Sequence, residues 1–320
     1  MKTAVITGGK GFVGGVLSNL LLKEGYKVKL LTRGRSAKTD NPMLESVGVD
    51  YTDVKDLQLA LEDANCVFHL AAAIFAFNKE EFYKANVELT KNVCKAASAV
   101  KGLESFVYLS SQAAAGPSQY KDNPIDETAT PAPVSDYGET KLGAEKYVLQ
   151  LPSPIRKTVL RAPVIYGRND SGVSKIASWV ARGFMVNTSS AEMFFNFVYV
   201  EDLVKALYTA SQTPQADGQI YFVCEPTSYS WQYFINTMAV AMDKPRPIMF
   251  SLPYPMLELA AFLYESTAKI FKITPALNYD KIKEAAINGH WVCRCNKWIA
   301  LTGQQFTPLA EGLKKSFKEK

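Results

Sequence analysis

"VITGGKGFVGG", residues 5–15, sets three glycines between an apolar run and a segment whose apolar residues recur at helical spacing. These glycines are Gly8, Gly11 and Gly14. At a strand–turn–helix junction the first permits a tight turn, the second lets the backbone approach a pyrophosphate, and the third lets helix and strand pack closely. The helix N-terminus then offers free N–H groups to the phosphates. This stretch therefore predicts a dinucleotide-binding site.

The same alternation of strand and helix continues through the first half of the chain. Apolar runs predict strands at 2–7, 26–32, 66–71, 106–111 and 157–162, and helical spacing predicts helices at 12–24, 54–62, 80–99 and 136–149. Almost wholly apolar strands are typical of a parallel sheet that helices cover on both faces. We therefore expect an α/β fold, a Rossmann-type doubly wound parallel sheet with a smaller, mostly α-helical substrate lobe.

The rhythm loosens after Gly167, which suggests how the chain is divided. Residues 1–167 are expected to form the NAD(P)-binding domain, rejoined by 197–224. Residues 168–196 and 225–320 are expected to form the substrate lobe as C-terminal insertions.

The end of the second predicted strand favours NADP over NAD. NAD-binding proteins usually place a carboxylate there to hold the ribose 2′-hydroxyl. This chain instead has Arg33 and Arg35 and no acid, and guanidinium groups suit a 2′-phosphate. The alternative is two solvated arginines and a site that also accepts NAD.

Composition limits which partners, compartment and metal ions are expected. The chain has 320 residues, a formal charge of +5 and scattered basic residues, so no nucleic-acid partner is expected. Five cysteines in no framework spacing indicate a reduced, cytoplasmic protein without a signal peptide. Cys293-x-Cys295 lacks further ligands, so no metal is expected. The apolar stretch 249–271 is interrupted by charges, which favours a pocket-lining helix over a membrane contact.

Three tyrosine–lysine pairs have the i, i+4 spacing that stacks two side chains on one helix face. They are Tyr51/Lys55, Tyr137/Lys141 and Tyr279/Lys283. Spacing alone does not choose among them.

The order of short motifs along nearly the whole chain resembles the extended short-chain dehydrogenase/reductase family. The motifs are "TGGKGFVG", "DV" (53–54), "HLAAA" (69–73), "NVELTKNV" (86–93), "YLSS" (108–111), "YGETK" (137–141), "RAPVIYG" (161–167) and "FVYVEDL" (197–203). The resemblance implies an NADP (or NAD) site formed by Gly8, Gly11, Phe12, Val13, Gly14, Thr32, Arg33, Arg35, Asp53, Val54, Leu70, Ala71, Ala72, Ala73, Tyr137, Lys141, Pro163 and Val164.

The resemblance also implies a catalytic triad of Ser111, Tyr137 and Lys141, with Ser110 as the rival serine. Free tyrosine, with a pKa near 10, is a poor base at neutral pH. A lysine ammonium one turn away, with the cationic oxidised nicotinamide, would favour the phenolate. Lys141 would hold the ribose hydroxyls and Ser111 the reacting oxygen. Homodimerisation through the helices at 80–99 and 136–149 is likewise implied.

Departures from the family pattern concern Gln112, Ala113 and Phe195, the expected substrate-contacting residues. Dehydratases place Asp-Glu after the serine, and deoxysugar epimerase-reductases place a cysteine at position 113, so neither reaction is expected. Phe195 stands where 4-epimerases usually carry an arginine for the pyrophosphate, although Arg246 or Arg294 could replace it.

"YLSSQAAAGPSQY" and "PAPVSDYGETKLGAEK" look like the 3β-hydroxysteroid dehydrogenase and dihydroflavonol reductase branch. The late lobe is rich in aromatic residues, which suit a hydrophobic substrate: Trp179, Phe184, Phe194, Phe195, Trp231, Tyr233, Phe234, Tyr254 and Phe262. The favoured hypothesis is an NADP-dependent oxidoreductase of hydrophobic secondary alcohols and ketones. A nucleotide-sugar 4-epimerase and a non-catalytic NAD(P)-binding regulator are the alternatives.

Overall fold

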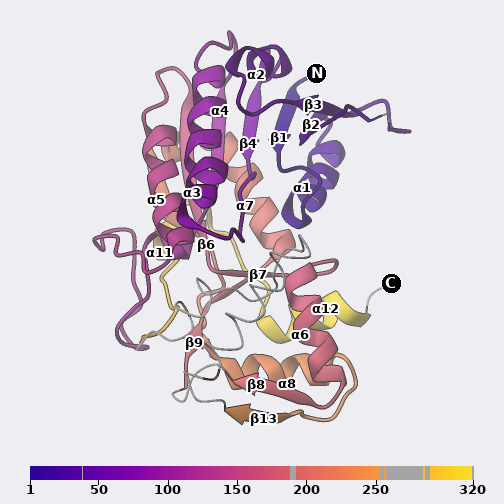
Figure 1. The fold of residues 1–320 in the computed structure, drawn as a ribbon, viewed down its shortest axis with the longest axis vertical. Helices are drawn as coiled ribbons and strands as arrows, with labels where there is room; N and C mark the ends of the chain where they lie inside the picture. Colours follow the sequence, from indigo (N-terminus) through magenta and orange to yellow (C-terminus); the bar gives the residue numbers. More distant parts are fainter. Residues whose placement is uncertain (38, 188–191, 252–255, 257–283, 285–288, 319–320) are drawn as a thin grey trace.

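A seven-stranded, fully parallel sheet forms the centre of the molecule (Figure 1). The computed structural model describes residues 1–320 except 38, 188–191, 252–255, 257–283, 285–288 and 319–320. The strands are β1 (Thr3–Thr7), β2 (Lys27–Arg33), β3 (Leu44–Val49), β4 (Cys66–His69), β5 (Ser105–Ser111), β6 (Arg156–Ala162) and β11 (Gln219–Phe222). Their order, β11-β6-β5-β4-β1-β2-β3, reverses direction between β1 and β4. Open α/β sheets bind ligands at the carboxyl ends of the strands beside such a point.

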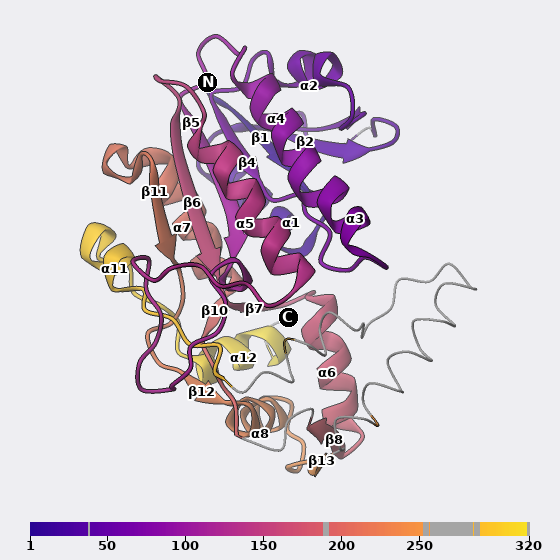
Figure 2. The same ribbon diagram turned by 60° about the vertical axis from the view of Figure 1, so that its left-hand side comes forward.

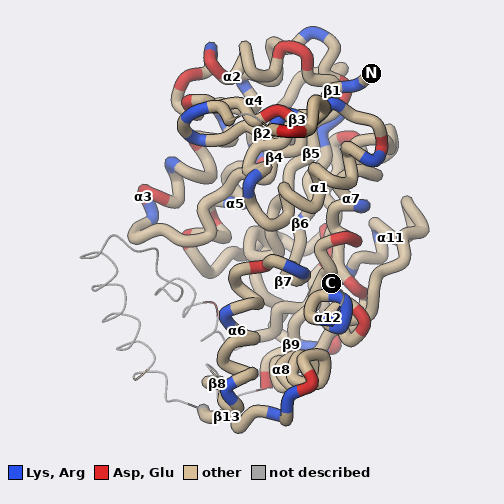
Figure 3. The backbone as a smooth tube through the Cα atoms, turned by 90° about the vertical axis from the view of Figure 1, so that its right-hand side faces the viewer, with Lys and Arg blue, Asp and Glu red and all other residues tan. Residues whose placement is uncertain are grey.

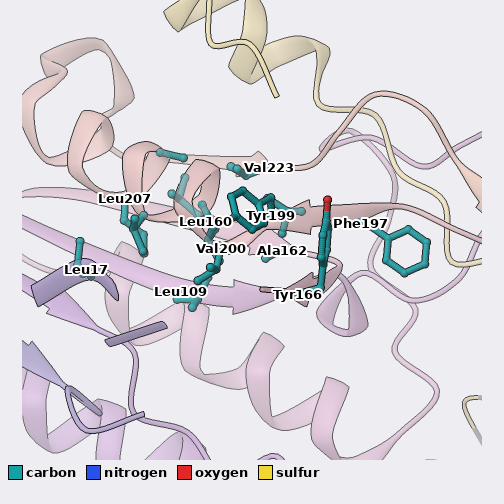
Figure 4. Close-up of a cluster of buried hydrophobic side chains, with 14 of the residues drawn as sticks. Leu17, Leu109, Leu160, Ala162, Tyr166, Phe197, Tyr199, Val200, Leu207 and Val223 are labelled. Atoms are coloured by element: carbon teal, nitrogen blue, oxygen red, sulfur yellow. The ribbon is translucent and has the colours of Figure 1, made fainter. Parts of the chain in front are cut away.

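Helices cover both faces of this sheet, as the apolar strands predict (Figure 2). One face is covered by α1 (Phe12–Lys23) and α7 (Val200–Gln212). The other is covered by α2 (Val54–Leu61), α4 (Leu89–Ala97) and α5 (Asp136–Leu149). On the first face, Leu17 and Leu207 share one apolar cluster with Tyr166 and Phe197 (Figure 4). The same cluster extends to Phe234 and Met238, which lie beyond the large sheet.

The helix expected over 80–99 is built in three parts. It consists of α3 (Lys79–Phe82), a π-helical segment over Tyr83–Glu88, and α4. A π-helical turn contains an extra residue, is rare, and often occurs at functional sites. Apolar spacing alone does not reveal such a turn, because the helical periodicity continues on either side of it.

The apolar runs missed one strand of the large sheet. Strand β3 was not expected from the sequence, because it is an edge strand whose buried positions are interrupted by exposed or half-exposed ones. Within 197–224, β10 (Phe197–Tyr199) pairs with β7 (Val164–Tyr166) in a separate two-stranded sheet, and β11 pairs with β6 of the large sheet. Helix α7 packs on β5 and β6 of the large sheet.

The remaining elements lie beyond the carboxyl ends of the large sheet or along its β11 edge (Figures 1 and 2). They are α6 (Ser171–Ala181), β8 (Phe184–Asn187), β9 (Phe194–Phe195), β12 (Tyr229–Ser230), α8 (Trp231–Ala241), β13 (Ile248–Ser251), α11 (Asn296–Thr302) and α12 (Leu309–Lys318), with 3-10 turns at Gln112–Ala114 and Pro214–Ala216. Basic and acidic residues are interspersed over the described chain (Figure 3). Within that part of the chain, every helix is too short or too polar to cross a bilayer.

Candidate functional site

The glycine loop between β1 and α1 is shaped for close approach. Gly8 has φ +70°, and a Cβ atom there would lie 2.9 Å from the backbone nitrogen of Ala71. A Cβ on Gly14 would lie 2.5 Å from the carbonyl oxygen of Gly8. Helix α1 begins after Gly11 with no side chain capping its amides. Free N–H groups at a helix start are a ready phosphate site, so the loop fits a dinucleotide pyrophosphate. Phe12 and Val13 occupy the first turn of this helix.

The side chain of Tyr51 contacts the glycine loop and supports it, a role that its sequence context did not predict. Its hydroxyl donates to the Leu31 carbonyl at 3.0 Å. Burial raises the pKa of Tyr51 to about 12, although a hydrogen bond from the Gly8 backbone and the charge of Arg33 oppose the rise. Tyr51 therefore joins β2 to the first glycine of the loop. It precedes α2, so Tyr51 and Lys55 do not share one helix face.

The carboxyl end of β2 presents the two predicted arginines. Arg33 ends the strand and Arg35 follows it, and both are exposed. Thr32 is buried beside them. Gly48 allows the loop to fold back, because a Cβ there would lie 1.9 Å from the carbonyl oxygen of Gly34. Both arginines are exposed at the end of β2, and the preference for NADP stays a prediction.

Asp53 and Val54 mark the start of α2. The Asp53 carboxylate accepts a hydrogen bond from the Lys55 backbone at 2.8 Å and caps the helix. This capping bond engages only one of the two carboxylate oxygens. The expected adenine contact stays a prediction.

The turn after β4 lies directly against Gly8 and is held from two sides. The backbone amides of Leu70 and Ala71 donate to Thr7 Oγ1 at 3.2 and 3.1 Å. Asn86, in the π-helical segment, accepts from the Ala73 amide at 2.7 Å and donates to the Ala73 carbonyl at 3.1 Å. Ala72 lies between these two attachments. Thr7 and Asn86 stand inside quoted motifs, but only three-dimensional contact reveals their role.

The two candidate serines at the end of β5 differ in their surroundings. Ser110 is buried and donates to Glu145 Oε1 at 2.6 Å. Arg161 makes two further hydrogen bonds to the same carboxylate, at 2.9 and 2.7 Å. Ser111 is half-buried, and its Oγ accepts from the Ala113 amide at 3.1 Å. Ser110 is therefore committed to a buried ion pair, which favours Ser111 as the serine that meets a substrate.

Lys141 is almost fully enclosed. It is 2% exposed, and its Nζ donates to the Leu109 carbonyl at 2.7 Å. The ammonium also lies 4.1 Å from the centre of the Tyr108 ring, a cation–π contact. Burial lowers the pKa of Lys141 to about 7, although the nearby Glu145 carboxylate favours the charged form. Leu109 is two residues before Ser111, so this contact ties the lysine to the strand of the candidate serine.

Tyr137 lies one turn before Lys141 on α5 and faces an apolar environment. The helix is capped by Ser135, whose Oγ accepts from the Gly138 amide. Tyr137 packs in one cluster with Ala113, Val134, Met193, Phe195 and Trp291. Its ring also lies 6.2 Å from that of Phe82. The predicted catalytic tyrosine and two predicted substrate residues, Ala113 and Phe195, are thereby brought together.

Other predicted site residues surround this cluster. Gln112 is 2% exposed, and its Nε2 has no hydrogen-bond partner among the described residues. Pro163 and Val164 connect β6 to β7, and Phe12 reaches Gly167 at the end of that motif. Arg294 is exposed and lines an open pocket of about 320 Å³ with Ser118 and Asp126.

Some of the aromatic residues after Gly167 are buried, and others are exposed. Phe234 is core and stacks on Phe197 at 4.7 Å, while Phe195 packs on Trp231 at 5.7 Å. Trp179 and Tyr233 are 44% and 47% exposed. Tyr254, Phe262, the Tyr279/Lys283 pair and most of 249–271 lie outside the described residues.

The cysteines are buried and carry free thiols: Cys66, Cys94, Cys224, Cys293 and Cys295. Cys224 and Cys293 approach with their Sγ atoms 3.7 Å apart. Among the described residues, His, Cys, Asp and Glu form no cluster able to hold a metal ion.

Comparison with known proteins agrees with this geometry. The profile of the "NAD dependent epimerase/dehydratase family" matches residues 4–224, more than half of the chain. The chain belongs to this family. The match spans the glycine loop, the turn after β4, and the Ser111, Tyr137 and Lys141 positions.

Relatives of this epimerase/dehydratase-family chain include both epimerases and dehydrogenases. UDP-glucose 4-epimerase of Vibrio cholerae is 26% identical over 292 residues, covering 87% of each chain. The 3-beta-hydroxysteroid dehydrogenase of Mycolicibacterium neoaurum is 28% identical over 260 residues, covering 76% of this chain and 71% of the relative.

The fold is also similar to that of UDP-glucose 4-epimerase from Thermus thermophilus, solved in complex with NAD. The TM-score is 0.76 at 20% identity, covering 98% of this chain and 97% of that one. These findings confirm the extended short-chain dehydrogenase/reductase resemblance and the Rossmann-like fold. The family chain is an enzyme of the dehydrogenase or epimerase type that uses a nicotinamide cofactor.

Proposed function

We propose that the protein is an NADP-dependent oxidoreductase that interconverts a secondary alcohol and a ketone on a hydrophobic small molecule. The observation that supports this best is the apolar cluster around Tyr137. Ala113, Val134, Met193, Phe195 and Trp291 surround the candidate catalytic tyrosine. Apolar walls with few polar groups suit a lipophilic substrate. A sugar pyrophosphate would require charge-assisted contacts, and Phe195 offers none.

Within this proposal the chain's residues have distinct tasks. Tyr137 takes the proton from the substrate hydroxyl, because Lys141 on the next turn favours its phenolate. Ser111 donates a hydrogen bond to the reacting oxygen. Gln112, Ala113 and Phe195 contact the rest of the substrate. When bound, the nicotinamide accepts or donates the hydride.

The glycine loop and its neighbours would hold NADP. Gly8, Gly11 and Gly14 leave room for the pyrophosphate, and the uncapped start of α1 meets its charge. Arg33 and Arg35 would bind the 2′-phosphate, with Thr32, Asp53 and Val54 nearby on the adenosine side. Leu70, Ala71, Ala72, Ala73, Pro163 and Val164 would line the nicotinamide half.

We also propose the division of the chain into a cofactor domain (1–167 with 197–224) and a substrate lobe (168–196 with 225–320). A homodimer would use α4 and α5, which lie side by side on one face of the sheet.

A nucleotide-sugar 4-epimerase is the second candidate. It is favoured by the relationship to Vibrio cholerae UDP-glucose 4-epimerase, which extends over 87% of the chain. An epimerase returns the hydride to the same carbon, so the cofactor shows no net change.

One pair of assays separates the two candidates. The protein is incubated with NADP⁺ and dehydroepiandrosterone, a 3β-hydroxysteroid, and absorbance at 340 nm is followed. In parallel it is incubated with UDP-galactose, and UDP-glucose is quantified. Steroid-dependent NADPH formation supports the oxidoreductase, with the Tyr137→Phe variant as the inactive control. UDP-glucose formation without cofactor turnover would establish the epimerase instead.

A further inference from the structure

We infer that His69 is a positioning residue that helps to join the turn after β4 to the catalytic helix α5 through two runs of buried hydrogen bonds that meet at Asn86. The inference rests on the proposed function, because it concerns how Tyr137 is placed. The contacts of His69 itself are independent of that function.

His69 ends β4 and is fully buried. Its Nδ1 lies 2.7 Å from Oγ1 of Thr7, the last residue of β1. Its Nε2 lies 2.8 Å from Oγ1 of Thr90 on α4. Both ring nitrogens are therefore engaged, and they connect two different elements.

The threonine partners determine which nitrogen of His69 holds the proton. Thr90 donates its hydroxyl hydrogen to the Asn86 carbonyl at 2.6 Å, so towards His69 it acts as an acceptor. His69 must then donate from Nε2, which leaves Nδ1 as an acceptor. Thr7 donates to Nδ1, and its lone pairs accept the Leu70 and Ala71 amides. The donor and acceptor roles of Thr7, His69 and Thr90 are then mutually consistent.

Asn86 continues the connection to α5. Its Nδ2 donates to Thr140 Oγ1 at 3.1 Å. Thr140 in turn donates to the carbonyl of Tyr137 at 2.9 Å. Asn86 reaches Ala73 with the same side chain, so the π-helical segment binds both the turn and the catalytic helix. The two runs meet at Asn86, whose backbone carbonyl accepts from Thr90 and whose side-chain amide donates to Thr140. Together they link the Ala71 amide to the Tyr137 carbonyl.

The ring of His69 also lies behind the catalytic lysine. It stacks on Tyr108 with centroids 5.3 Å apart and planes at 22°. Lys141 Nζ lies over that same Tyr108 ring. Burial and the Lys141 charge lower the pKa of His69 to about 3. His69 therefore remains neutral at physiological pH, which suits a fixed connector and not a proton carrier.

The first test reads the tautomer directly, on the full chain labelled with ¹⁵N-histidine. The chain has only two histidines, so a His290→Asn variant assigns both sets of signals. The expected spectrum shows His69 as the neutral Nε2–H tautomer from about pH 5.5 to about 8.5, well above its lowered pKa. An Nδ1–H tautomer or an imidazolium signal would overturn the direction of these hydrogen bonds. This result does not depend on any substrate.

The second test removes the connecting hydrogen bonds at two separate residues. Thr90→Val and Thr140→Val each remove one hydroxyl and keep the side-chain shape. Thr158→Val is the matched control. Thr158 is also buried, and its hydroxyl donates to the Ala216 carbonyl at 3.0 Å, a bond that takes no part in the contacts of His69 and Asn86. Thermal melts, NADPH fluorescence titrations and turnover of dehydroepiandrosterone are measured for all three.

Coupling predicts that Thr90→Val and Thr140→Val both raise the Kd for NADPH by on the order of fivefold, although Thr140 lies on the catalytic helix. Turnover should fall by about tenfold, since misplaced reacting groups lose rate steeply. The double variant should be little worse than the poorer single one, because each change frees the same residue, Asn86, from one of its anchors. Thr158→Val should lower only the melting temperature.

Additive losses, or an unchanged NADPH Kd in Thr140→Val, would overturn the inference. His69→Gln, which keeps an acceptor and a donor, should recover part of the binding that His69→Phe loses. If the unmodified protein does not oxidise the steroid, the proposed substrate fails, while the tautomer and NADPH results still decide the role of His69.

Discussion

Tyr51 and Tyr137 each precede a lysine by four residues, yet they occupy very different surroundings. Tyr51 stands before a helix, is buried, and donates to the Leu31 carbonyl. Tyr137 stands inside the first turn of α5, is half-buried, and shares a face with the enclosed Lys141. Burial raises the pKa of Tyr51, which disfavours its phenolate. The spacing is thus the same, but the burial that disfavours the Tyr51 phenolate argues against acid–base chemistry there, and we propose that role for Tyr137 alone.

The difference shows that a residue pair gains chemistry from the elements that present it. The motif around Tyr137 brings a serine strand, a helix start and an apolar cluster to one tyrosine. The motif around Tyr51 brings a glycine loop to one hydroxyl. Both tyrosines serve the proposed site, one as a base and the other as support for the cofactor loop.

Removing the Tyr137 hydroxyl should have the largest effect of any single change. We expect Tyr137→Phe to lower kcat for dehydroepiandrosterone by about 10³-fold, within the range for a lost acid–base group. The Kd for NADPH should rise by no more than about threefold, because the lost hydroxyl is only one of many expected cofactor contacts. The melting temperature should change little, because the ring still packs in its cluster. Steady-state kinetics and NADPH titration test this together. Turnover that survives in the variant would show that Tyr137 is not the base.

Lys141→Met should come next, with a loss in kcat of about 10²-fold, because the phenolate loses its cation. The same change alters how stability depends on pH. The pKa of Lys141 is lowered to about 7 in the folded protein from an ordinary value of 10.5, so the unfolded chain binds more protons between these values. The cost of burying the charge is complete below about pH 7 and disappears as pH rises towards 10.5.

The free energy of unfolding of the unmodified protein should therefore rise relative to Lys141→Met across that window. Denaturant melts at about pH 6, 7.5 and 9 measure the difference between the two proteins. Other titrating groups cancel in this difference, since both proteins contain them. A constant difference would mean that the pKa of Lys141 is not lowered in the folded state.

Changes to the two arginines at the end of β2 should have a smaller and more selective effect. Replacing Arg33 and Arg35 together with alanine should raise the Kd for NADPH by about tenfold or more while leaving that for NADH nearly unchanged. The reason is that only NADPH has the 2′-phosphate. Arg246→Ala is the control, because Arg246 is also exposed but lies in a different part of the chain, between α8 and β13. Equal losses for both cofactors would contradict the preference for NADP.

The sequence predicted best those parts of the fold that depend on local patterns. Apolar runs located five strands of the large sheet, because a doubly covered parallel sheet buries both strand faces. It did not reveal β3, since an edge strand with Glu45 and Gly48 lacks that pattern. It predicted one helix where a π-helical segment interrupts two α-helices, because one extra residue leaves the apolar spacing almost intact.

Site residues follow the same rule. Gly8, Ser111, Tyr137 and Lys141 stand in ordered motifs and could be named from the sequence. Contacts between Asn86 and Ala73 or Thr140 join positions far apart in the chain. Such contacts depend on tertiary packing, and no local pattern specifies them. The order of the motifs already favours Ser111 over Ser110, but the physical reason, Glu145 and Arg161 behind Ser110, depends on tertiary contacts.

Tyr51→Phe should have the smallest effect and returns to the comparison of the two tyrosines. The change removes the hydrogen bond to Leu31 and the contact with the Gly8 backbone but keeps the packed ring. A buried hydrogen bond contributes about 1 kcal/mol, so the free energy of unfolding should fall by roughly that amount. The Kd for NADPH should rise by about threefold, because the first glycine of the loop is held less firmly. The kcat at saturating cofactor should stay within about twofold, since no reacting group is touched. A loss of kcat comparable to that of Tyr137→Phe would mean that Tyr51 takes part in the reaction itself and does not only support the cofactor loop.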